Sequence, residues 1–192
     1  MTATSFAIFE TAIGACGIAW GERGIAAVQL PETSAQKTRA RLLRRFPAAR
    51  EVPPSPEVQR ALDGITALLR GEASDLSAVA LDMEGLPAFN RRVYEVARAI
   101  PPGATLSYGE IAARLGEPPQ AARDVGQALG QNPIPIIVPC HRVLAANGKP
   151  GGFSASGGVT TKLRLLTIEK AKISDEPALF DDLPLAAKPR RQ

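Results

Sequence analysis

The sequence predicts a two-part fold: an α/β N-terminal domain with a small antiparallel sheet plus helix, and an all-helical C-terminal domain containing a helix-turn-helix-like unit. Three observations predict it. Apolar residues separated by glycines fill the first thirty positions, apolar residues recur every three or four positions after Pro87, and two short helical segments flank a proline-rich turn. We place the domains at residues 1–84 and 85–172, followed by a tail at 173–192 that we expect to be disordered.

The N-terminal domain begins with strands. Residues 6–30 combine apolar positions with glycines, and the stretch at residues 21–24 is typical of a hairpin loop. Helices are predicted at residues 38–46, which end at a proline, and at residues 56–70, which begin after a serine and end at a glycine. Residues 76–83 alternate loosely and predict one more strand.

The C-terminal domain reads as helices separated by turns. Four helices are predicted, at residues 89–100, 108–115, 120–129 and 160–172. Ser107 caps the second helix, and the tight proline-rich turn before the third gives the helix-turn-helix-like pattern. An extended, proline-spaced segment at residues 132–139 and a glycine-rich loop at residues 148–158 lie between the third and fourth helices.

The composition is that of an ordinary soluble protein. The 192 residues suffice for one good core or two small ones, and 45% hydrophobic and 22% charged residues are typical values. The net charge of +4 suits a protein that binds a polyanion, but many proteins without such a partner share it. No apolar stretch approaches the ~20 residues that span a bilayer, and nothing resembles a signal peptide. We expect a cytoplasmic protein (bacterial cytoplasm or nucleoid) without a membrane partner.

The two cysteines, Cys16 and Cys140, predict neither a disulfide nor a metal site. A structural zinc ion normally takes four nitrogen or sulfur ligands, and the chain contains one histidine, His141. We therefore expect no metal, and both thiols reduced in the cytoplasm.

Cys140 is the candidate nucleophile. It stands in the run Pro139-Cys140-His141-Arg142-Val143, where the only histidine follows it directly. A cysteine reacts as the thiolate, which an adjacent base or cation favours. Neighbours in an extended strand point to opposite faces, so a contact between thiol and imidazole requires a turn or helix start at this point. Pro139 before the cysteine and the turn-forming residues around it favour such a bend. An isolated Cys-His pair is more often a buried, inert cysteine beside a histidine that backbone groups satisfy.

The string NPIPIIVPCHRV at residues 132–143 resembles the signature of the O-6-alkylguanine-DNA alkyltransferases, also called methylated-DNA–protein-cysteine methyltransferases. Further segments resemble the same family, in the same order: residues 11–30, 107–112, 121–126, 151–154 and 165–169. The resemblance covers about residues 6–172. It implies a ribonuclease-H-like N-terminal domain and a winged-helix or helix-turn-helix-like C-terminal domain that carries the active site.

This resemblance implies direct-reversal DNA repair, in which an alkyl group moves from O-6 of guanine, or alternatively O-4 of thymine, to the protein's own cysteine. Cys140 is then the nucleophile, His141 activates it through a water, and Glu169 orients His141. Tyr108 supplies a proton or hydrogen bond to the leaving guanine. No residue hydrolyses a thioether, so each molecule reacts once, and no cofactor is needed.

The resemblance also implies a monomer that binds double-stranded DNA containing alkylated guanine through the minor groove. The target base is flipped out of the stack, and Arg123 fills its place. Ala122, Gly126 and Gly130 give one helix face without bulky side chains, which lets DNA approach but is equally typical of tight helix packing. The implied DNA-binding residues are Ser107, Ala121, Ala122, Arg123 and Gly126. The implied substrate-binding residues are Asn132, Val143, Phe153 and Ser154.

Four features depart from the family pattern. Phe153 stands where many relatives have tyrosine. The loop at residues 153–158 is two residues longer than the commonest form, and its length affects the size of the alkyl pocket. Asp124 beside Arg123, and Gly130 at a position often basic in relatives, weaken the attraction of phosphates. The N-terminal metal-binding residues of some relatives have no counterpart.

Other functions remain open to the sequence alone. A binding-only relative would recognise alkylated bases and recruit other repair factors, but such relatives lack the cysteine. A transcription regulator that reads the major groove needs polar side chains on its recognition helix, where this sequence has glycines. A cysteine hydrolase needs an oxyanion loop near the cysteine, and none can be identified in this sequence. Residues 178–185 of the tail combine apolar clusters with acids, which suggests either a short motif for a weak protein partner or an unconstrained terminus.

Overall fold

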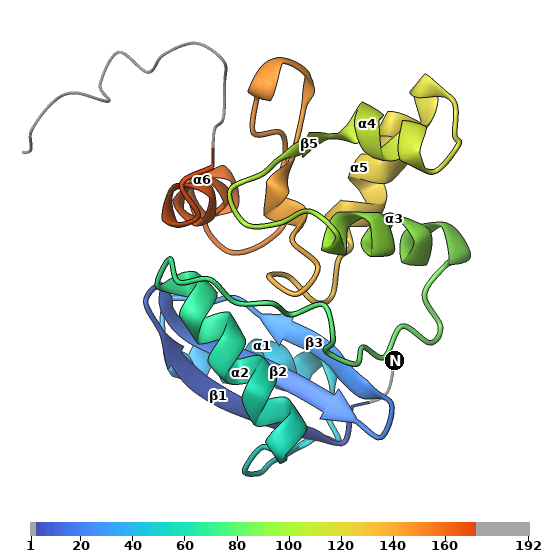
Figure 1. Cartoon of the computed structure of the whole chain (residues 1–192). Helices are drawn as coiled ribbons and strands as arrows, with labels where there is room; N and C mark the ends of the chain where they lie inside the picture. The colour runs from blue at the N-terminus through green and yellow to red at the C-terminus, as the bar shows by residue number, and fades with distance from the viewer. Residues whose placement is uncertain (1–2, 172–192) are drawn as a thin grey trace, which may run out of the picture.

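The computed structural model describes residues 3–171 and arranges them as two stacked units (Figure 1). The sheet unit contains β1 (Ser5–Thr11), β2 (Gly14–Gly21), β3 (Gly24–Gln29), α1 (Ala35–Arg45), β4 (Arg50–Glu51) and α2 (Pro56–Leu69). The helical unit contains α3 (Ala88–Arg98), β5 (Leu106–Ser107), α4 (Tyr108–Arg114), α5 (Ala122–Gly130), β6 (Val143–Leu144) and α6 (Gly158–Ile168). The predicted tail and its segment at residues 178–185 lie outside the described residues.

The sheet has the strand order β3-β2-β1-β4. It is mixed, so the prediction of a purely antiparallel sheet is wrong. The first three strands form two antiparallel hairpins, whereas β4 pairs parallel to β1 over two residues. Parallel pairing needs a crossover, and α1 supplies it between β3 and β4. Gly24 lies at the turn between β2 and β3 with φ 118°, where a Cβ would come within 2.4 Å of the Ala80 carbonyl oxygen.

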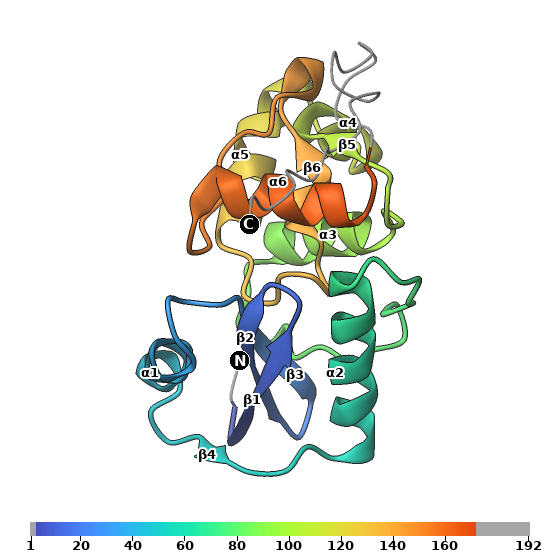
Figure 2. The ribbon, with the colours of Figure 1, turned by 90° about the vertical axis from the view of Figure 1, so that its left-hand side faces the viewer.

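The two helices of this unit cover opposite faces of the sheet (Figure 2). Successive strand residues point to alternate faces, so Phe6 and Ala19 pack with Leu42 of α1. Ile18 packs instead into the larger core that includes Ile65 of α2. That core continues into the helical unit, so the two units share buried apolar residues rather than meeting at a polar seam.

The prediction of a strand at residues 76–83 is wrong. This segment forms only an isolated bridge, between Leu81 and Ile25 of β3. The backbone N–H of Ile25 donates to the Ala80 carbonyl at 2.9 Å, so the connection follows the edge of β3 without forming a ladder. Its loose alternation arises because one side of the segment rests on the sheet unit.

Every predicted helix is present, with its ends within four residues of the expected positions. Ser107 caps α4 as predicted, through a reciprocal pair: its Oγ accepts from the Glu110 N–H at 3.2 Å, and Glu110 accepts from the Ser107 N–H at 2.6 Å. The helical unit is not all-helical, because β5 and β6 pair in parallel, Leu106 with Val143 and Ser107 with Leu144. This short ladder joins the start of α4 to the segment that follows Cys140.

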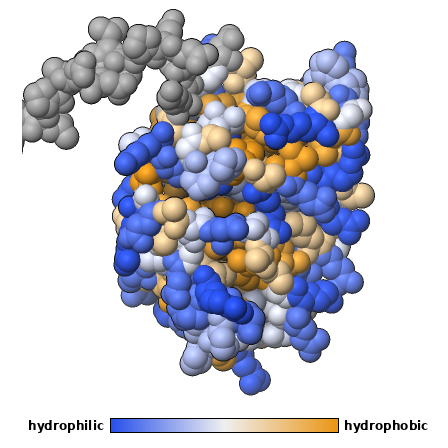
Figure 3. All heavy atoms as spheres, in the orientation of Figure 1, coloured by the Kyte–Doolittle hydropathy of each residue, from blue (hydrophilic) through white to orange (hydrophobic). Residues whose placement is uncertain are grey.

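The units are fixed to each other beside the Cys140 segment. The N–H of Val28 in β3 donates to the Pro133 carbonyl at 3.0 Å, and Arg164 of α6 donates to the Ala12 carbonyl at 2.9 Å. Hydrophobic side chains on the face seen in Figure 3 gather mainly over the helical unit. Val159 is the one large hydrophobic side chain in residues 3–171 that is exposed, so the other large hydrophobic side chains there are buried or partly buried. Within the same residues, no helix has the length and apolar character to cross a membrane.

Candidate active site

Cys140 begins a single 3-10 turn, Cys140–Arg142, that follows Pro139. The N–H of Arg142 donates to the Pro139 carbonyl at 2.9 Å and closes this turn. The predicted bend at the cysteine is therefore confirmed. Both neighbours belong to this turn, so they do not alternate as on an extended strand; Cys140 is 8% exposed and His141 is fully buried.

Asn132 holds the segment that leads to Cys140. Its Nδ2 donates to the Val138 carbonyl at 2.8 Å, and its Oδ1 accepts from the Ile134 N–H at 3.0 Å. Between these anchors Ile136 has φ 73°, a conformation that a β-branched residue rarely adopts. Asn132 thus shapes the turn before the active-site segment, because one side chain closes a strained loop and sets the position of the cysteine.

A buried ion-pair network lies directly behind the cysteine. The carboxylate of Glu169, next to the end of α6, accepts from His141 Nε2 at 2.9 Å and from Arg142 Nε and Nη2 at 2.9 and 2.8 Å. Arg142 also donates to the Ile100 carbonyl at 2.5 Å. The His141 and Glu169 side chains are 1% and 6% exposed. Arg142 therefore fixes the carboxylate that holds the histidine.

The network also sets the tautomer of His141. A carboxylate accepts hydrogen bonds only, so Nε2 carries the proton and Nδ1 carries the lone pair. Burial lowers the pKa of His141 more than Glu169 raises it, so the imidazole is neutral. Nδ1 is buried and has no hydrogen-bond partner within the described residues. A buried polar atom of this kind is normally satisfied by water, which leaves Nδ1 available as a proton acceptor.

Burial raises the pKa of the Cys140 thiol, while a hydrogen bond from Asn132, the charge of Lys162 and nearby backbone N–H groups oppose that increase. Burial would also raise the pKa of Glu169, but hydrogen bonds from His141 and Arg142 outweigh it and lower the pKa to about 2. The site therefore contains a permanent carboxylate, a neutral histidine and a protonated thiol. If Cys140 acts as a nucleophile, its thiol proton must therefore be removed as it reacts.

Lys162 is a site residue that the sequence analysis missed. It is fully buried on α6, its Nζ donates to the Val143 carbonyl at 2.5 Å, and it lies 5.8 Å from the centre of the Tyr108 ring. Burial lowers its pKa to about 8. The available signal was its helical phase: a lysine three and four positions before Leu165 and Leu166 lies on their buried face.

Tyr108, the first residue of α4, lies beside the cysteine. Burial raises the pKa of its hydroxyl, and a charge on Cys140 raises it further, so the phenol stays protonated and able to donate. Gly151 has φ 65°, and a Cβ at this position would lie 2.9 Å from the Tyr108 hydroxyl. The glycine-rich loop thus comes close to Tyr108 only because residue 151 has no side chain.

A cavity of about 530 Å³ brings most of the predicted site residues together, and we call it the α5 pocket. Its lining comes from the start of α4, one face of α5, the cysteine and the glycine-rich loop: Tyr108, Ala122, Arg123, Gly126, Leu129, Gly130, Cys140, Gly152, Phe153 and Ser154. Val125 and Ala128, on the opposite face of α5, are buried in the core. The small-residue face of α5 therefore lies open toward Cys140 rather than packing against another helix.

His141 and Glu169 lie behind the cysteine and Asn132 lies in the segment before it, and three further predicted residues do not line this pocket either. The Ala121 side chain is 7% exposed and packs in the core, so it is not on the open face of α5 with Ala122. Val143 is fully buried in β6, and its carbonyl is engaged by Lys162. The Ser107 hydroxyl is used as the cap of α4. Any contact of these residues with a ligand would have to be made through the backbone or after a rearrangement.

Comparisons with known proteins identify the family of the chain. Residues 88–171 match the family model described as 6-O-methylguanine DNA methyltransferase, DNA binding domain. A methylated-DNA–protein-cysteine methyltransferase of Methanothermobacter thermautotrophicus is 34% identical over 160 residues, which cover 83% of this chain and 82% of that protein. The protein of the same description from Mycobacterium bovis is 46% identical over 121 residues, covering 63% of this chain and 70% of that protein.

Solved structures give the same result. The crystal structure of the Mycobacterium tuberculosis O6-methylguanine methyltransferase matches with a TM-score of 0.69 and 36% identity, over 86% of this chain and 92% of that chain. The Mycobacterium tuberculosis protein in complex with DNA matches with a TM-score of 0.67 and 36% identity, over the same shares. The chain therefore belongs to the 6-O-methylguanine DNA methyltransferase family.

Proposed function

We propose that this protein repairs O6-alkylguanine in DNA directly, as a methylated-DNA–protein-cysteine methyltransferase whose acceptor is Cys140. The observation that carries the assignment to Cys140 is its place in the α5 pocket, with the His141–Glu169 pair directly behind it. Cys16, the other cysteine, is fully buried in the sheet unit, where burial raises its pKa to about 12. The contrast between the two thiols supports Cys140 as the reactive one.

The transfer is a displacement at the alkyl carbon. The bond between Sγ of Cys140 and this carbon forms while the bond from the carbon to guanine O6 breaks. The electron pair of the broken bond stays on the guanine, which takes up a proton, and the phenol of Tyr108 is placed to donate there. The thiol proton passes through a water to Nδ1 of His141. No group in the pocket reverses the thioether, so one molecule repairs one lesion.

Binding to duplex DNA follows from the face of the molecule on which the α5 pocket opens. We assign α4, the turn at residues 115–121 and α5 as a helix-turn-helix-like unit whose small-residue face enters the minor groove. The exposed Arg123 at the start of α5 then takes the place of the flipped base. A single chain supplies every residue of the proposed site, which supports a monomer. The ribonuclease-H-like arrangement of the sheet unit stays a prediction.

The test is an intact-mass measurement after incubation with a duplex that carries one O6-methylguanine. We expect a gain of one methyl group per protein molecule and no further turnover with excess DNA. Peptide mapping should find the methyl group on the peptide containing Cys140, and not on the one containing Cys16. Unmodified protein, or a methyl group on Cys16, would refute the assignment.

Replacing Lys162 by methionine should slow transfer at neutral pH by about 10-fold, because loss of the nearby cation raises the pKa of the Cys140 thiol and leaves less thiolate. The pKa of Lys162 is about 8, so the difference from the wild type is present below pH 8 and disappears above it as the lysine loses its charge. The rate of reaction with free O6-benzylguanine, measured from pH 6 to about pH 9.5, checks this. The exposed Lys170, replaced in the same way, is the control. A slowing that persists unchanged at high pH would contradict the electrostatic role.

A further inference from the structure

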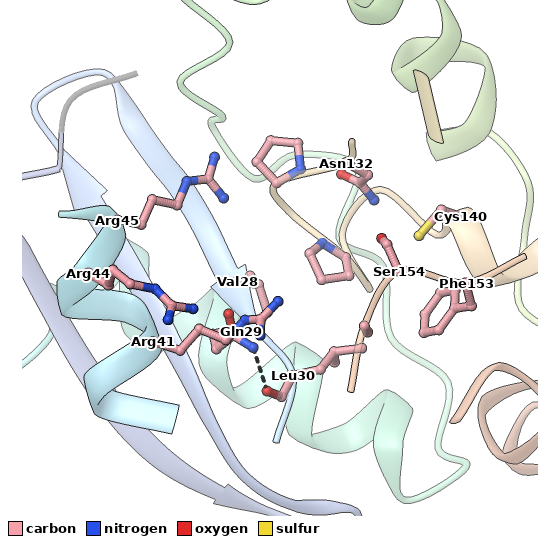
Figure 4. A pocket seen from close by; sticks show the side chains of 13 residues that line it. Val28, Gln29, Leu30, Arg41, Arg44, Arg45, Asn132, Cys140, Phe153 and Ser154 are labelled. Atoms are coloured by element: carbon pink, nitrogen blue, oxygen red, sulfur yellow. Dashed lines mark hydrogen bonds between the residues drawn. The ribbon is translucent and has the colours of Figure 1, made fainter. Parts of the chain in front are cut away.

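A second cavity, which does not include Tyr108 or α5 in its lining, also reaches Cys140. It has a volume of about 280 Å³ and lies between the sheet unit and the helical unit. Figure 4 shows Cys140, Phe153 and Ser154 at one end and three arginines of α1 at the other. We call this cavity the α1 groove. Cys140 thus has two openings, the α5 pocket and the α1 groove.

The α1 groove carries positive charge that the described residues leave largely uncompensated. Arg41, Arg44 and Arg45 line it, and no acidic side chain among residues 3–171 does. Arg41 is paired with Glu32 at 3.2 Å, whereas Arg44 and Arg45 form no ion pair within residues 3–171. The whole of α1 contains five basic residues and no acidic one. A recess lined by charges of one sign concentrates their field and attracts a ligand of the opposite sign.

The geometry of displacement relates the groove to the transferred group. At the reacting carbon the sulfur and the guanine oxygen occupy opposite ends of one line, so the rest of the alkyl group must extend to the side. With guanine in the α5 pocket, where Tyr108 and Arg123 lie, the open space on another side of Cys140 is the α1 groove. Phe153 gives the groove an apolar wall at the cysteine end, where Asn132 and Ser154 also lie, and its far end is cationic.

We propose that the α1 groove is the site for the distal part of large O6-substituents, and that it selects substituents ending in a negative charge. This inference rests on the proposed function. The lesion class is an O6-alkyl or O6-aralkyl guanine with a terminal carboxylate. The apolar wall holds its hydrocarbon part, and Arg44 and Arg45 attract the carboxylate. The bonds formed and broken are those of methyl transfer, and the carboxylate itself does not react.

The same arginines invite a different interpretation, in which they contact DNA phosphates beside the lesion. The described geometry favours the substituent, because the groove is a recess of limited volume that ends at the thiol rather than a track along the surface. The two interpretations differ in which substrates respond to the arginines. The carboxylate interpretation predicts an effect on a free base without any DNA, and the phosphate interpretation predicts none.

The test compares two free bases of almost equal shape, O6-(4-carboxybenzyl)guanine and its neutral carboxamide O6-(4-carbamoylbenzyl)guanine. The rate of thioether formation is followed by intact mass. For the wild type we expect the carboxylate to react about 3- to 10-fold faster than the amide, an advantage that falls with added salt. The variant Arg44→Gln/Arg45→Gln should react equally with both bases, at the wild-type rate for the amide. The control Lys37→Gln/Arg60→Gln removes two exposed charges outside the groove and should keep the preference.

Each outcome decides between the ideas. A wild type with no carboxylate preference, or a preference that survives in the Arg44→Gln/Arg45→Gln variant, overturns the inference. If that variant loses only its rate on duplex O6-methylguanine, the arginines bind phosphates instead. Failure of the wild type with the neutral base and with methylated duplex alike would count against the proposed function itself, which separates the two failures.

Discussion

Replacing Glu169 by glutamine is expected to lower the free energy of unfolding by about 3–5 kcal/mol and to slow alkyl transfer by at least about 100-fold. Within residues 3–171, the carboxylate is the only acidic partner of the buried Arg142, which is 4% exposed, and it accepts three hydrogen bonds. A glutamine removes the charge and turns one acceptor into a donor that faces Arg142. The same change removes the carboxylate that holds the proton on Nε2 of His141, so the tautomer with the lone pair on Nδ1 is no longer fixed. Urea unfolding and the rate on free O6-benzylguanine measure the two effects.

Two further variants make this prediction independent of misfolding. Arg142→Met/Glu169→Gln removes both buried charges, so it should regain part of the lost stability but none of the lost rate. Glu117→Gln breaks the exposed pair with Arg92 and should cost less than about 1 kcal/mol without any effect on the rate. Recovery of the rate in the double variant would show that Glu169 acts only by supporting the fold, and not by orienting His141.

The pH dependence of stability follows from the same carboxylate. The pKa of Glu169 in the folded protein is about 2, against a usual value of 4.5. A lowered pKa stabilises the fold above pH 4.5, and this contribution is lost as the pH falls from 4.5 toward 2. The wild type should therefore lose stability over this interval more steeply than the Glu169→Gln variant. Equal slopes would contradict the buried ion pair.

The sequence predicted those elements whose signals are local. Glycine-separated apolar runs gave the hairpins, and three- and four-residue spacing gave the helices, because each pattern reflects one buried face. Ser107 was identified as a cap because its side chain bonds only three residues away. The bend at Cys140 was expected from Pro139 and the turn-forming residues nearby, and the structure contains it.

The remaining features depend on contacts between distant segments. β5 and β6 pair over a sequence separation of more than thirty residues, and neither strand is long enough to show alternation. Residues 76–83 alternate but rest against β3 without joining the sheet, so the same pattern arises from burial alone. Lys162 was missed because a buried lysine breaks the expected rule that lysines are exposed. The α1 groove is lined by residues of both units, so it exists only in the folded chain and no local sequence motif predicts it.

Replacing Arg123 by alanine is expected to slow repair of O6-methylguanine in duplex DNA by about 10- to 100-fold, while the rate on free O6-benzylguanine changes less than about 2-fold. The reason is that unstacking a base costs a few kcal/mol, and an inserted side chain recovers part of that cost. Arg123 lies at the rim of the α5 pocket, close to Cys140 but outside the His141–Glu169 network. The two rates, measured by intact mass on the same preparation, separate base flipping from chemistry.

Two variants determine what kind of contact Arg123 makes. Arg123→Lys keeps the charge but loses the planar guanidinium, so insertion into the stack predicts a rate near that of the alanine variant, whereas a phosphate contact predicts a rate near the wild type. Arg114→Ala removes an exposed charge of α4 that does not line the pocket and should leave both rates nearly unchanged. Equal losses on duplex and free base in Arg123→Ala would place Arg123 in the chemistry of the pocket instead. Because Asp124 follows Arg123 and Gly130 adds no charge, α5 attracts DNA phosphates only weakly apart from Arg123. A pure phosphate role for one arginine would then leave base extrusion without a residue to support it, which is why the lysine variant is the decisive measurement.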